Sequence, residues 1–239
     1  MQVSLIKSSF YFTYIFLITT GTICFIEALR NPVPQIRHIM NLETCISVVA
    51  GYFYGLFVAK INKAEKDVEK DAEENPEQNK NQNKELELPL EKINDMRYTD
   101  WAISTPLMLL VLCMVLGYEN KKIVSFLPFM LILLFNFLML GAGYIGEIGK
   151  LTRTMANSIG FLFFFLMYGT VWKVYMTGAK RTTQSVIIFG LFAFLWSLYG
   201  VLYQTDKMTK VFGYNILDLL SKAFVGIFFW FYLTKSIRF

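Results

Sequence analysis

The sequence predicts an all-α membrane protein, a bundle of seven transmembrane helices. Of its 239 residues, 55% are hydrophobic and 17% are aromatic, which is more apolar surface than a soluble domain of this size needs. The apolar residues lie in seven stretches with few charges, each close to the ~20 residues that a helix needs to cross about 30 Å of hydrocarbon. These stretches are continuous rather than alternating in polarity, which favours helices over a closed barrel.

The apolar stretches give the bounds of the expected helices within a single domain, residues 1–239. We expect helices at about 8–29, 38–60, 97–117, 122–146, 154–177, 182–205 and 209–234. The first stretch is too long for a secretion signal and ends in Glu27 and Arg30, so we interpret it as a spanning helix. The three cysteines all fall inside apolar stretches, where we expect them to be packing residues rather than disulfide partners.

Residues 61–95 form a long charged loop between the second and third helices. This stretch is rich in Lys, Asp, Glu, Asn and Gln and cannot bury enough apolar surface to offset the entropy of ordering it. Its first part, about 62–72, could form a solvated helix. A solvated linker is the simpler interpretation, and a segment that docks a partner is the alternative.

Seven spans put the two termini on opposite sides of the membrane. If the lysines of the long loop are not counted, the side of the membrane that holds the C-terminus has more Lys and Arg. The positive-inside rule then places the C-terminus in the cytoplasm and the N-terminus outside. The lysines of the loop reverse that count, so composition alone leaves the orientation open.

The predicted spans hold few charges, because an ionised side chain at the bilayer centre costs at least about 2.5–3.5 kcal/mol. They are Arg97, Asp100, Asp218 and Lys222, with Glu27 and Glu43 nearer the ends of their helices. Arg97 and Asp100 are three residues apart, and Asp218 and Lys222 are four apart, so each pair shares a helix face. They could be salt bridges that hold helices together, although a buried ion pair is weak evidence for stability. Their neighbours favour a functional role.

The residues around these charges form motifs on several predicted helices. "RYTDWAISTPLML" contains Arg97, Asp100, Trp101, Ser104 and Thr105; "FLWSLYGVLYQ" contains Trp196, Tyr199 and Tyr203; "DLLSKAFVG" contains Asp218 and Lys222; "NFLMLGAGYIGE" contains Met139 and Gly143. In this order, and over all seven helices, the motifs resemble those of the microbial (type 1) rhodopsin family. Gly200 departs from the family pattern, which has proline there.

The resemblance implies a bundle that encloses a retinal pocket, with all-trans retinal attached to Lys222 as a Schiff base. The implied pocket residues are Trp101, Thr105, Met139, Gly143, Trp196, Tyr199 and Tyr203. A protonated imine is a cation in a low-dielectric interior, so it needs negative charge nearby. The resemblance assigns this role to Asp100, which is also the proton acceptor, and to Asp218.

Other polar residues are expected to support the two carboxylates. Arg97 lies one turn from Asp100 and would relieve the repulsion between two like charges. Ser104 is the hydroxyl one turn beyond Asp100, and Tyr54, Tyr199 and Thr105 could donate hydrogen bonds to the carboxylates.

Two departures from the family pattern bear on what the protein does. Outward proton pumps of this family carry a carboxylate where this chain has Val111, and an acidic release group where it has Lys210. Without the first group, Asp100 could still accept a proton, but no donor is evident for fast reloading. These departures disfavour an efficient pump.

Two acids near the first connection suggest a different activity. Glu27 and Glu43 would lie toward the cytoplasmic side, with Asn41 and Arg30 close in sequence. They could form an ion-paired cluster at the helix ends, or a hydrophilic constriction on a cation path, since clusters of acids select cations. With these acids the chain looks most like the group 1 viral rhodopsins, described as light-gated cation channels.

We therefore expect a light-gated cation channel in the plasma membrane of a host cell, with its N-terminus outside and its C-terminus cytoplasmic. A light-driven outward proton pump and a sensory photoreceptor that signals through a partner are the alternatives, along with a bundle that binds no retinal. Expected partners are the lipid bilayer, retinal, and small cations or protons as transported species. A homo-oligomer is left open, because family members commonly form trimers or pentamers but no motif here encodes one.

Other functional classes have little support in the sequence. No nucleophile–base constellation or metal-ligand cluster is visible, which argues against an enzyme or a metal site. The net charge of +5 fits contact with lipid headgroups better than nucleic-acid binding, because the basic residues flank the membrane segments.

Overall fold

The computed structural model describes residues 3–74, 88–178 and 182–234, without the side chains of residues 71–74. Its elements are α1 (Val3–Arg30), α2 (Pro34–Glu74), α4 (Leu90–Asn120), α5 (Phe126–Glu147), α6 (Arg153–Val171), the π-helical turn η1 (Trp172–Met176), α7 (Thr183–Tyr203), α8 (Lys207–Asp218), the π-helical turn η2 (Leu219–Phe224) and α9 (Val225–Thr234). α6 runs directly into η1, and α8, η2 and α9 follow one another without a break. Within the described ranges, seven helical segments are long and apolar enough to cross a membrane, which confirms the predicted all-α fold.

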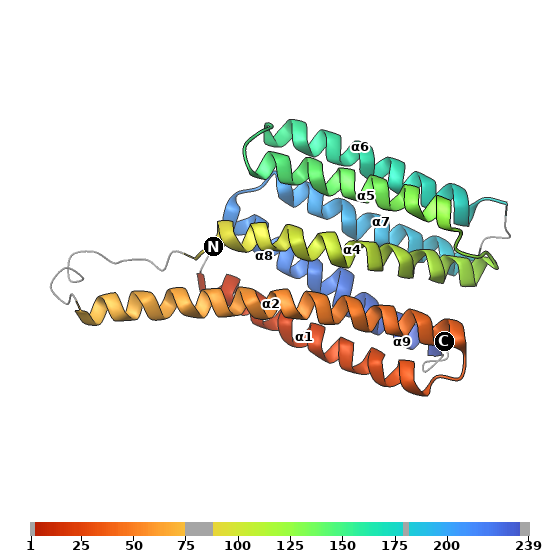
Figure 1. Ribbon diagram of the computed structural model, residues 1–239, viewed down its shortest axis with the longest axis horizontal. Coiled ribbons are helices and arrows are strands. Elements are labelled where there is room, and N and C mark those ends of the chain that lie inside the picture. The colour runs from red at the N-terminus through yellow and green to blue at the C-terminus, as the bar shows by residue number, and fades with distance from the viewer. Residues whose placement is uncertain (1–2, 75–87, 179–181, 235–239) are drawn as a thin grey trace.

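The helices form a closed ring in chain order (Figure 1). Each packs on the next, from α1 through α2, α4, α5, α6 and α7 to α8, and α8, η2 and α9 pack back on α1. α4 is the most buried of the seven spans and α5 is the least buried. Of the most apolar 18 residues of each helix, 61% are buried in α4 and 17% in α5. The ring therefore has its polar interior along α4 and presents α5 outward.

The two ends of the bundle are named here by the terminus that lies there. The N-terminal end of the bundle holds the beginnings of α1, α4 and α8 and the last turns of α2. The C-terminal end holds the last turns of α1, α4 and α9 and the beginning of α2. Because α2 runs antiparallel to α1, a residue early in α2 lies near the C-terminal end.

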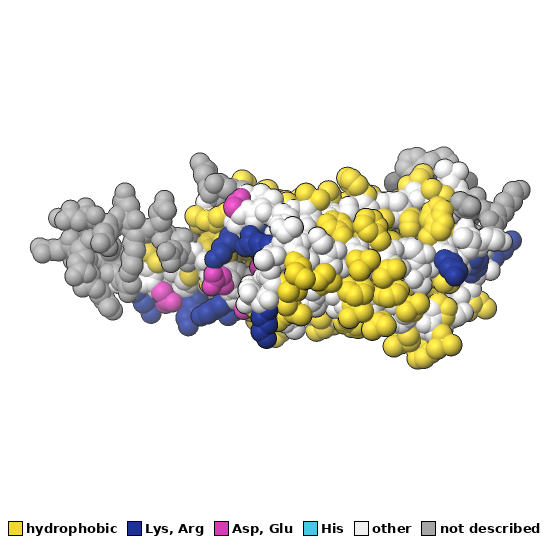
Figure 2. Space-filling model, turned by 90° about the horizontal axis from the view of Figure 1, so that it is seen from above, with side chains coloured by type: hydrophobic (Ala, Val, Ile, Leu, Met, Phe, Trp, Pro, Cys, Tyr) yellow, Lys and Arg dark blue, Asp and Glu magenta, His cyan; other side chains and the backbone are white. Residues whose placement is uncertain are grey.

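The outer surface between these ends is apolar, as a membrane-spanning protein requires. Large side chains such as Phe12, Leu127, Phe165 and Phe194 are at least 60% exposed. Figure 2 shows hydrophobic side chains covering the middle of the visible face, with Lys and Arg toward both ends and Asp and Glu toward the left end. This distribution matches a hydrocarbon layer with polar boundaries, and the chain is an integral, multi-pass membrane protein.

The predicted loop at 61–95 is largely helical where the structure describes it. α2 continues to Glu74 because side chains beyond residue 60 bind α1: Lys7 forms an ion pair with Glu65, and the Tyr11 hydroxyl donates to Asn62 at 2.7 Å. α4 begins at Leu90, seven residues before the predicted start, and Ile93 in its first turn is buried. Residues 75–87 lie outside the described part of the chain.

Gly117 provides a test of the packing at the end of α4. A Cβ at this position would lie 2.6 Å from the carbonyl oxygen of Lys122, a backbone atom that follows the left-handed Lys121. Gly117→Ala should therefore lower the free energy of unfolding by roughly 1–3 kcal/mol. Gly169→Ala is the matched control, because no atom lies within 4 Å of its added Cβ. Thermal loss of helical circular dichroism in detergent would compare them; equal midpoints for the two variants would contradict this view of the α4 end.

Candidate functional site

Four buried charges meet in the interior of the bundle. Arg97 and Asp100 come from α4, Asp218 ends α8, and Lys222 lies in η2; all four side chains are at most 1% exposed. Lys222 Nζ lies 2.7 Å from Asp100 Oδ2, and Arg97 Nη1 lies 2.9 Å from Asp218 Oδ2. Lys222 Nζ is also 3.5 Å from Asp218 Oδ1. The two closest pairs connect different helices, whereas the sequence spacing had paired the charges within each helix.

The two carboxylates differ in how fully their oxygens are bound. Asp218 accepts hydrogen bonds from the hydroxyls of Tyr54 and Tyr199, both at 2.8 Å, and from the indole of Trp101 at 3.3 Å, in addition to Arg97. Asp100 accepts only from Lys222, and its Oδ1 has no hydrogen-bond partner among the described residues. Asp100 therefore has the oxygen that is free to take a proton.

Two hydroxyls near Asp100 behave differently from each other. Ser104 Oγ is buried and has no hydrogen-bond partner in the described part of the chain. Thr105 was expected to donate to a carboxylate, but it donates to the carbonyl of Trp101 at 2.6 Å and accepts from Asn136 Nδ2 at 2.9 Å. The expectation for Thr105 is wrong because, in a helix, its hydroxyl reaches the carbonyl one turn earlier.

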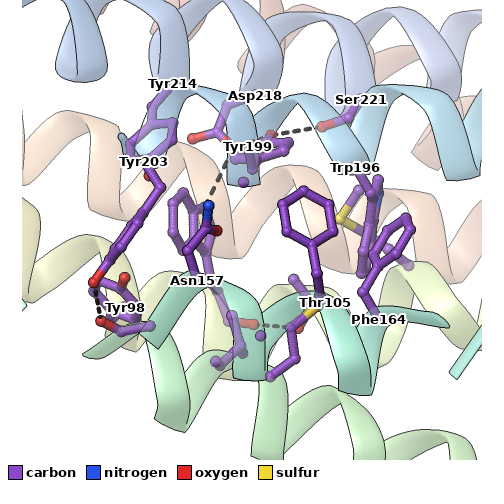
Figure 3. Close-up of a pocket in the computed structure, with 18 of the residues that line it drawn as sticks. Tyr98, Thr105, Asn157, Phe164, Trp196, Tyr199, Tyr203, Tyr214, Asp218 and Ser221 are labelled. Atoms are coloured by element: carbon purple, nitrogen blue, oxygen red, sulfur yellow. Dashed lines mark hydrogen bonds between the residues drawn. The ribbon is translucent and has the colours of Figure 1, made fainter. Parts of the chain in front are cut away.

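An apolar cavity begins at this charge cluster and extends between α4, α5, α6 and α7 (Figure 3). It encloses about 760 Å³ of space, part of which is open to the outside. Lys222 lines it together with all seven residues expected in the pocket: Trp101, Thr105, Met139, Gly143, Trp196, Tyr199 and Tyr203. Sequence reasoning missed further lining residues, among them Met108, Asn157, Phe161 and Phe164.

Two glycines shape the cavity walls. A Cβ at Gly143 would lie 2.9 Å from the hydroxyl oxygen of Tyr98, and a Cβ at Gly200 would lie 2.6 Å from the ring of Phe161. Aromatic side chains thus pack directly on the backbones of α5 and α7. The packing of Phe161 gives a physical reason for glycine at position 200. A long apolar slot that ends at a buried amine fits retinal, which Lys222 would hold.

The acids near the C-terminal end lie in two separate environments. Glu27 accepts from Arg30, Asn31 and Trp230 at 2.8, 2.8 and 3.1 Å and forms an ion-paired cluster at the end of α1. Glu43 is 2% exposed and, among the described residues, has neither a hydrogen bond nor an ion pair.

The position of Glu43 is fixed by its contact with α9. A Cβ at Gly226 would lie 3.0 Å from Glu43 Oε2, so the carboxyl lies against α9 about one turn beyond Lys222. Asn41 is exposed on α2. Of the four residues predicted to line an ion path, the structure brings only Glu27 and Arg30 together.

The sequence analysis named Lys210 but did not predict its ion pair, and it missed Asn94, Glu147 and Asn215 near the N-terminal end. Lys210 Nζ lies 2.7 Å from Glu147 Oε1, and Asn94 donates to the same carboxylate at 3.0 Å. Asn215 is fully buried and binds Arg97. The signal for Asn215 was present, since it is a polar residue three positions before Asp218 in an apolar helix.

Comparison with known proteins identifies relatives along nearly the whole chain. The family model described as "Bacteriorhodopsin-like protein" matches residues 5–236. The crystal structure of the viral rhodopsin OLPVRII is similar, with a TM-score of 0.82 and 43% identity, over 98% of this chain and 100% of that one. Xanthorhodopsin, titled a light-driven ion pump with dual chromophore, shares the fold with a TM-score of 0.70 at 20% identity, over 95% of this chain and 91% of that one.

Two curated relatives match part of the chain. Opsin-1 of Neurospora crassa is 28% identical over 158 residues, which is 58% of this chain and 48% of that protein. The green-light absorbing proteorhodopsin of Gamma-proteobacterium EBAC31A08 is 27% identical over 153 residues, 56% of this chain and 59% of that protein. The aligned part of the chain thus spans about half the length of the curated relatives it matches.

Replacing Lys222 tests whether this amine holds retinal. Lys222→Ala should abolish the visible absorption that appears when retinal is added, whereas the control Lys207→Ala, on an exposed lysine, should keep it. Because Lys222→Ala leaves Asp100 as an unpaired buried charge, it could cost about 3–5 kcal/mol of stability. The double variant Lys222→Ala/Asp100→Asn removes that charge; a retinal-dependent visible band in this folded double variant would rule out attachment at Lys222.

Proposed function

The chain belongs to the bacteriorhodopsin-like family of microbial rhodopsins, and on this premise we propose that it is a light-driven proton transporter. As a member it is a retinal-binding, light-activated membrane protein and not an enzyme. We propose all-trans retinal as the bound isomer, Asp100 as the first proton acceptor and Glu43 as the group that returns a proton to the site.

The position of Glu43 carries this proposal. The absence of a carboxylate at Val111 had argued against a pump, because α4 then offers no donor for reloading. Glu43 lies on α2 instead, buried and unpaired, against α9 about one turn from Lys222. Asp100 contacts Lys222 from α4, ten residues from the beginning of that helix near the N-terminal end. Lys222 Nζ thus has the carboxyl group of Asp100 toward the N-terminal end and that of Glu43 toward the C-terminal end.

The first proton transfer follows from the contacts around Lys222. Bound retinal supplies light absorption and photoisomerisation, while the protein positions and tunes. The proton leaves the Lys222 nitrogen for Asp100, whose Oδ2 lies 2.7 Å away and whose Oδ1 is free. Asp218 is also close, at 3.5 Å, but its oxygens already accept from Arg97 and two tyrosines. The transfer neutralises both partners, so no isolated charge is left in the low-dielectric interior.

The second transfer completes the cycle. Glu43 gives its proton to the Lys222 nitrogen and regains one from the solvent at the C-terminal end. The proton on Asp100 leaves toward the N-terminal end, past Arg97 and Asn94, which precede Asp100 at three-residue steps along α4. We propose the orientation with the N-terminus outside and the C-terminus in the cytoplasm, which makes the transport outward.

A light-gated cation channel is the second candidate. A buried carboxyl without a partner is also a favourable place for a cation, and Glu27 lies at the same end of the bundle. The similarity to the viral rhodopsin OLPVRII supports a viral type of rhodopsin. That protein belongs to group 2, so the similarity does not support the predicted group 1 membership, and a sensory role stays a prediction.

Voltage clamp of illuminated, retinal-supplied cells separates the two candidates. A proton transporter should give a current of one sign that persists without an ion gradient, and Asp100→Asn should abolish it. A channel should give a current that reverses with voltage, and a reversing current that survives Asp100→Asn would overturn our proposal.

Glu43→Gln tests the reloading role directly. Removing the acid should slow recovery of the protonated pigment by about 100-fold, within the range of general acid catalysis, and an added small weak acid should restore the rate in part. Flash spectroscopy would measure this recovery. Glu91→Gln, which changes an exposed acid, is the control. Unchanged recovery in Glu43→Gln would exclude this carboxyl as the donor, and an effect of Glu27→Gln on cation current would favour the channel.

A further inference from the structure

Asn215 connects the guanidinium of Arg97 to α1. Its Oδ1 accepts from Arg97 Nη2 at 2.7 Å and from the Tyr54 hydroxyl at 3.2 Å, while its Nδ2 donates to Ser9 Oγ at 2.8 Å. Ser9 in turn donates to the carbonyl of Ile6 at 2.6 Å. All the polar atoms of this amide side chain are therefore used in a relay that ends on the backbone of α1.

The backbone of Asn215 is fixed as well. Its carbonyl accepts from Thr13 Oγ1 at 3.0 Å, and the residue is 0% exposed. The amide is in addition held on two helices, by Ser9 of α1 and Arg97 of α4, so the side chain has little freedom to move even without this backbone bond. Asn215 is thus a rigid acceptor for Arg97.

The orientation of the Arg97 guanidinium depends on hydrogen-bond acceptors such as Asn215. The guanidinium carbon lies 5.2–5.9 Å from the ring centroids of Phe10, Tyr54, Phe57 and Tyr214. These aromatic contacts restrict the position of the guanidinium but do not determine which carboxylate it binds. Arg97 Nη1 binds Asp218 and Tyr54, Nη2 binds Asn215, and Nε has no partner among the described residues.

Arg97 has a second carboxylate within reach along its own helix. Asp100 is three residues away on α4, a spacing that places both side chains on one face. If Arg97 turned to Asp100, it would occupy the free oxygen of that carboxylate and withdraw one donor from Asp218.

We propose that Asn215 is a positioning residue that selects Asp100 as the proton acceptor by holding Arg97 on Asp218. The inference rests on the proposed proton transfer from Lys222. Without the Asn215 acceptor, Arg97 redistributes between the two carboxylates, and Asp218 then competes for the proton.

The test compares three variants of the retinal-loaded, full-length protein. Asn215→Leu has a similar size and no acceptor; Asn215→Asp keeps an oxygen for Arg97; Thr13→Val removes a bond to the backbone of Asn215 without touching Arg97. Light-minus-dark infrared spectra report the carbonyl stretch of the newly protonated carboxyl group. Asp100→Asn and Asp218→Asn, each also combined with Asn215→Leu, assign the bands.

We expect wild type and Thr13→Val to show the Asp100 band alone. Asn215→Leu should lose most of that band and gain one from Asp218, with a shifted visible absorption maximum, and Asn215→Asp should restore the Asp100 band. An unchanged band and an unchanged absorption maximum in Asn215→Leu would overturn the proposal. If Asn215→Leu does not fold, Ser9→Ala, which frees one end of the amide, should give a smaller change in the same direction; no change there would also count against it.

The experiment distinguishes a failure of the Asn215 proposal from a failure of the proposed proton transport. An Asp100 band in a wild-type protein that moves no net protons would defeat the transport proposal and leave the role of Asn215 intact. If the wild type showed no Asp100 band, the dark absorption maximum would decide, because a displaced Arg97 changes the charge near Lys222. A shift in Asn215→Leu but not in Thr13→Val would then show that Asn215 holds Arg97, while the selection of Asp100 as proton acceptor would be overturned.

Discussion

The need to neutralise Lys222 inside a membrane constrains the rest of this structure. A lone ammonium or imine cation in the bundle would be very costly, and a single carboxylate beside it would have to serve both as a permanent partner and as a proton acceptor. We propose that the protein divides these tasks between two aspartates. In this proposal Asp218, bound by Arg97, two tyrosines and a tryptophan, serves as the permanent anion and leaves Asp100 available for chemistry.

This division depends on elements far apart in the sequence. Tyr54 from α2, Trp101 from α4 and Tyr199 from α7 all donate to one carboxylate at the end of α8. Through Arg97, the same cluster reaches Asn215 and then α1. The helices are thus joined in the interior by polar contacts, whereas their outer faces present apolar side chains to lipid. In lipid, where apolar burial drives association weakly, such contacts help to define one arrangement of the ring.

Much of this could be predicted from the sequence, because a membrane makes charge patterns unusually informative. The seven spans followed from apolar length, and the residues of the pocket followed from motifs that resemble a known family. The helical extension of α2 could not be found by hydropathy, since it is held by an ion pair and a hydrogen bond to α1 rather than by apolar burial. The ion pair of Arg97 with Asp218 was also hidden, because spacing along one helix says nothing about what faces it from another. Glu43 was identified as a possible member of a cation path, but its contact with α9 required the fold.

The ion pair of Lys210 and Glu147 has a consequence for how the N-terminal end responds to its surroundings. Both side chains are at most 9% exposed, and Asn94 covers one carboxylate oxygen, so dissolved ions have little access to them. The neighbouring pair of Lys207 and Glu91 is largely exposed and would weaken as ionic strength rises. A change in ionic strength should therefore alter the strength of the Lys207–Glu91 pair and leave that of the buried Lys210–Glu147 pair unchanged.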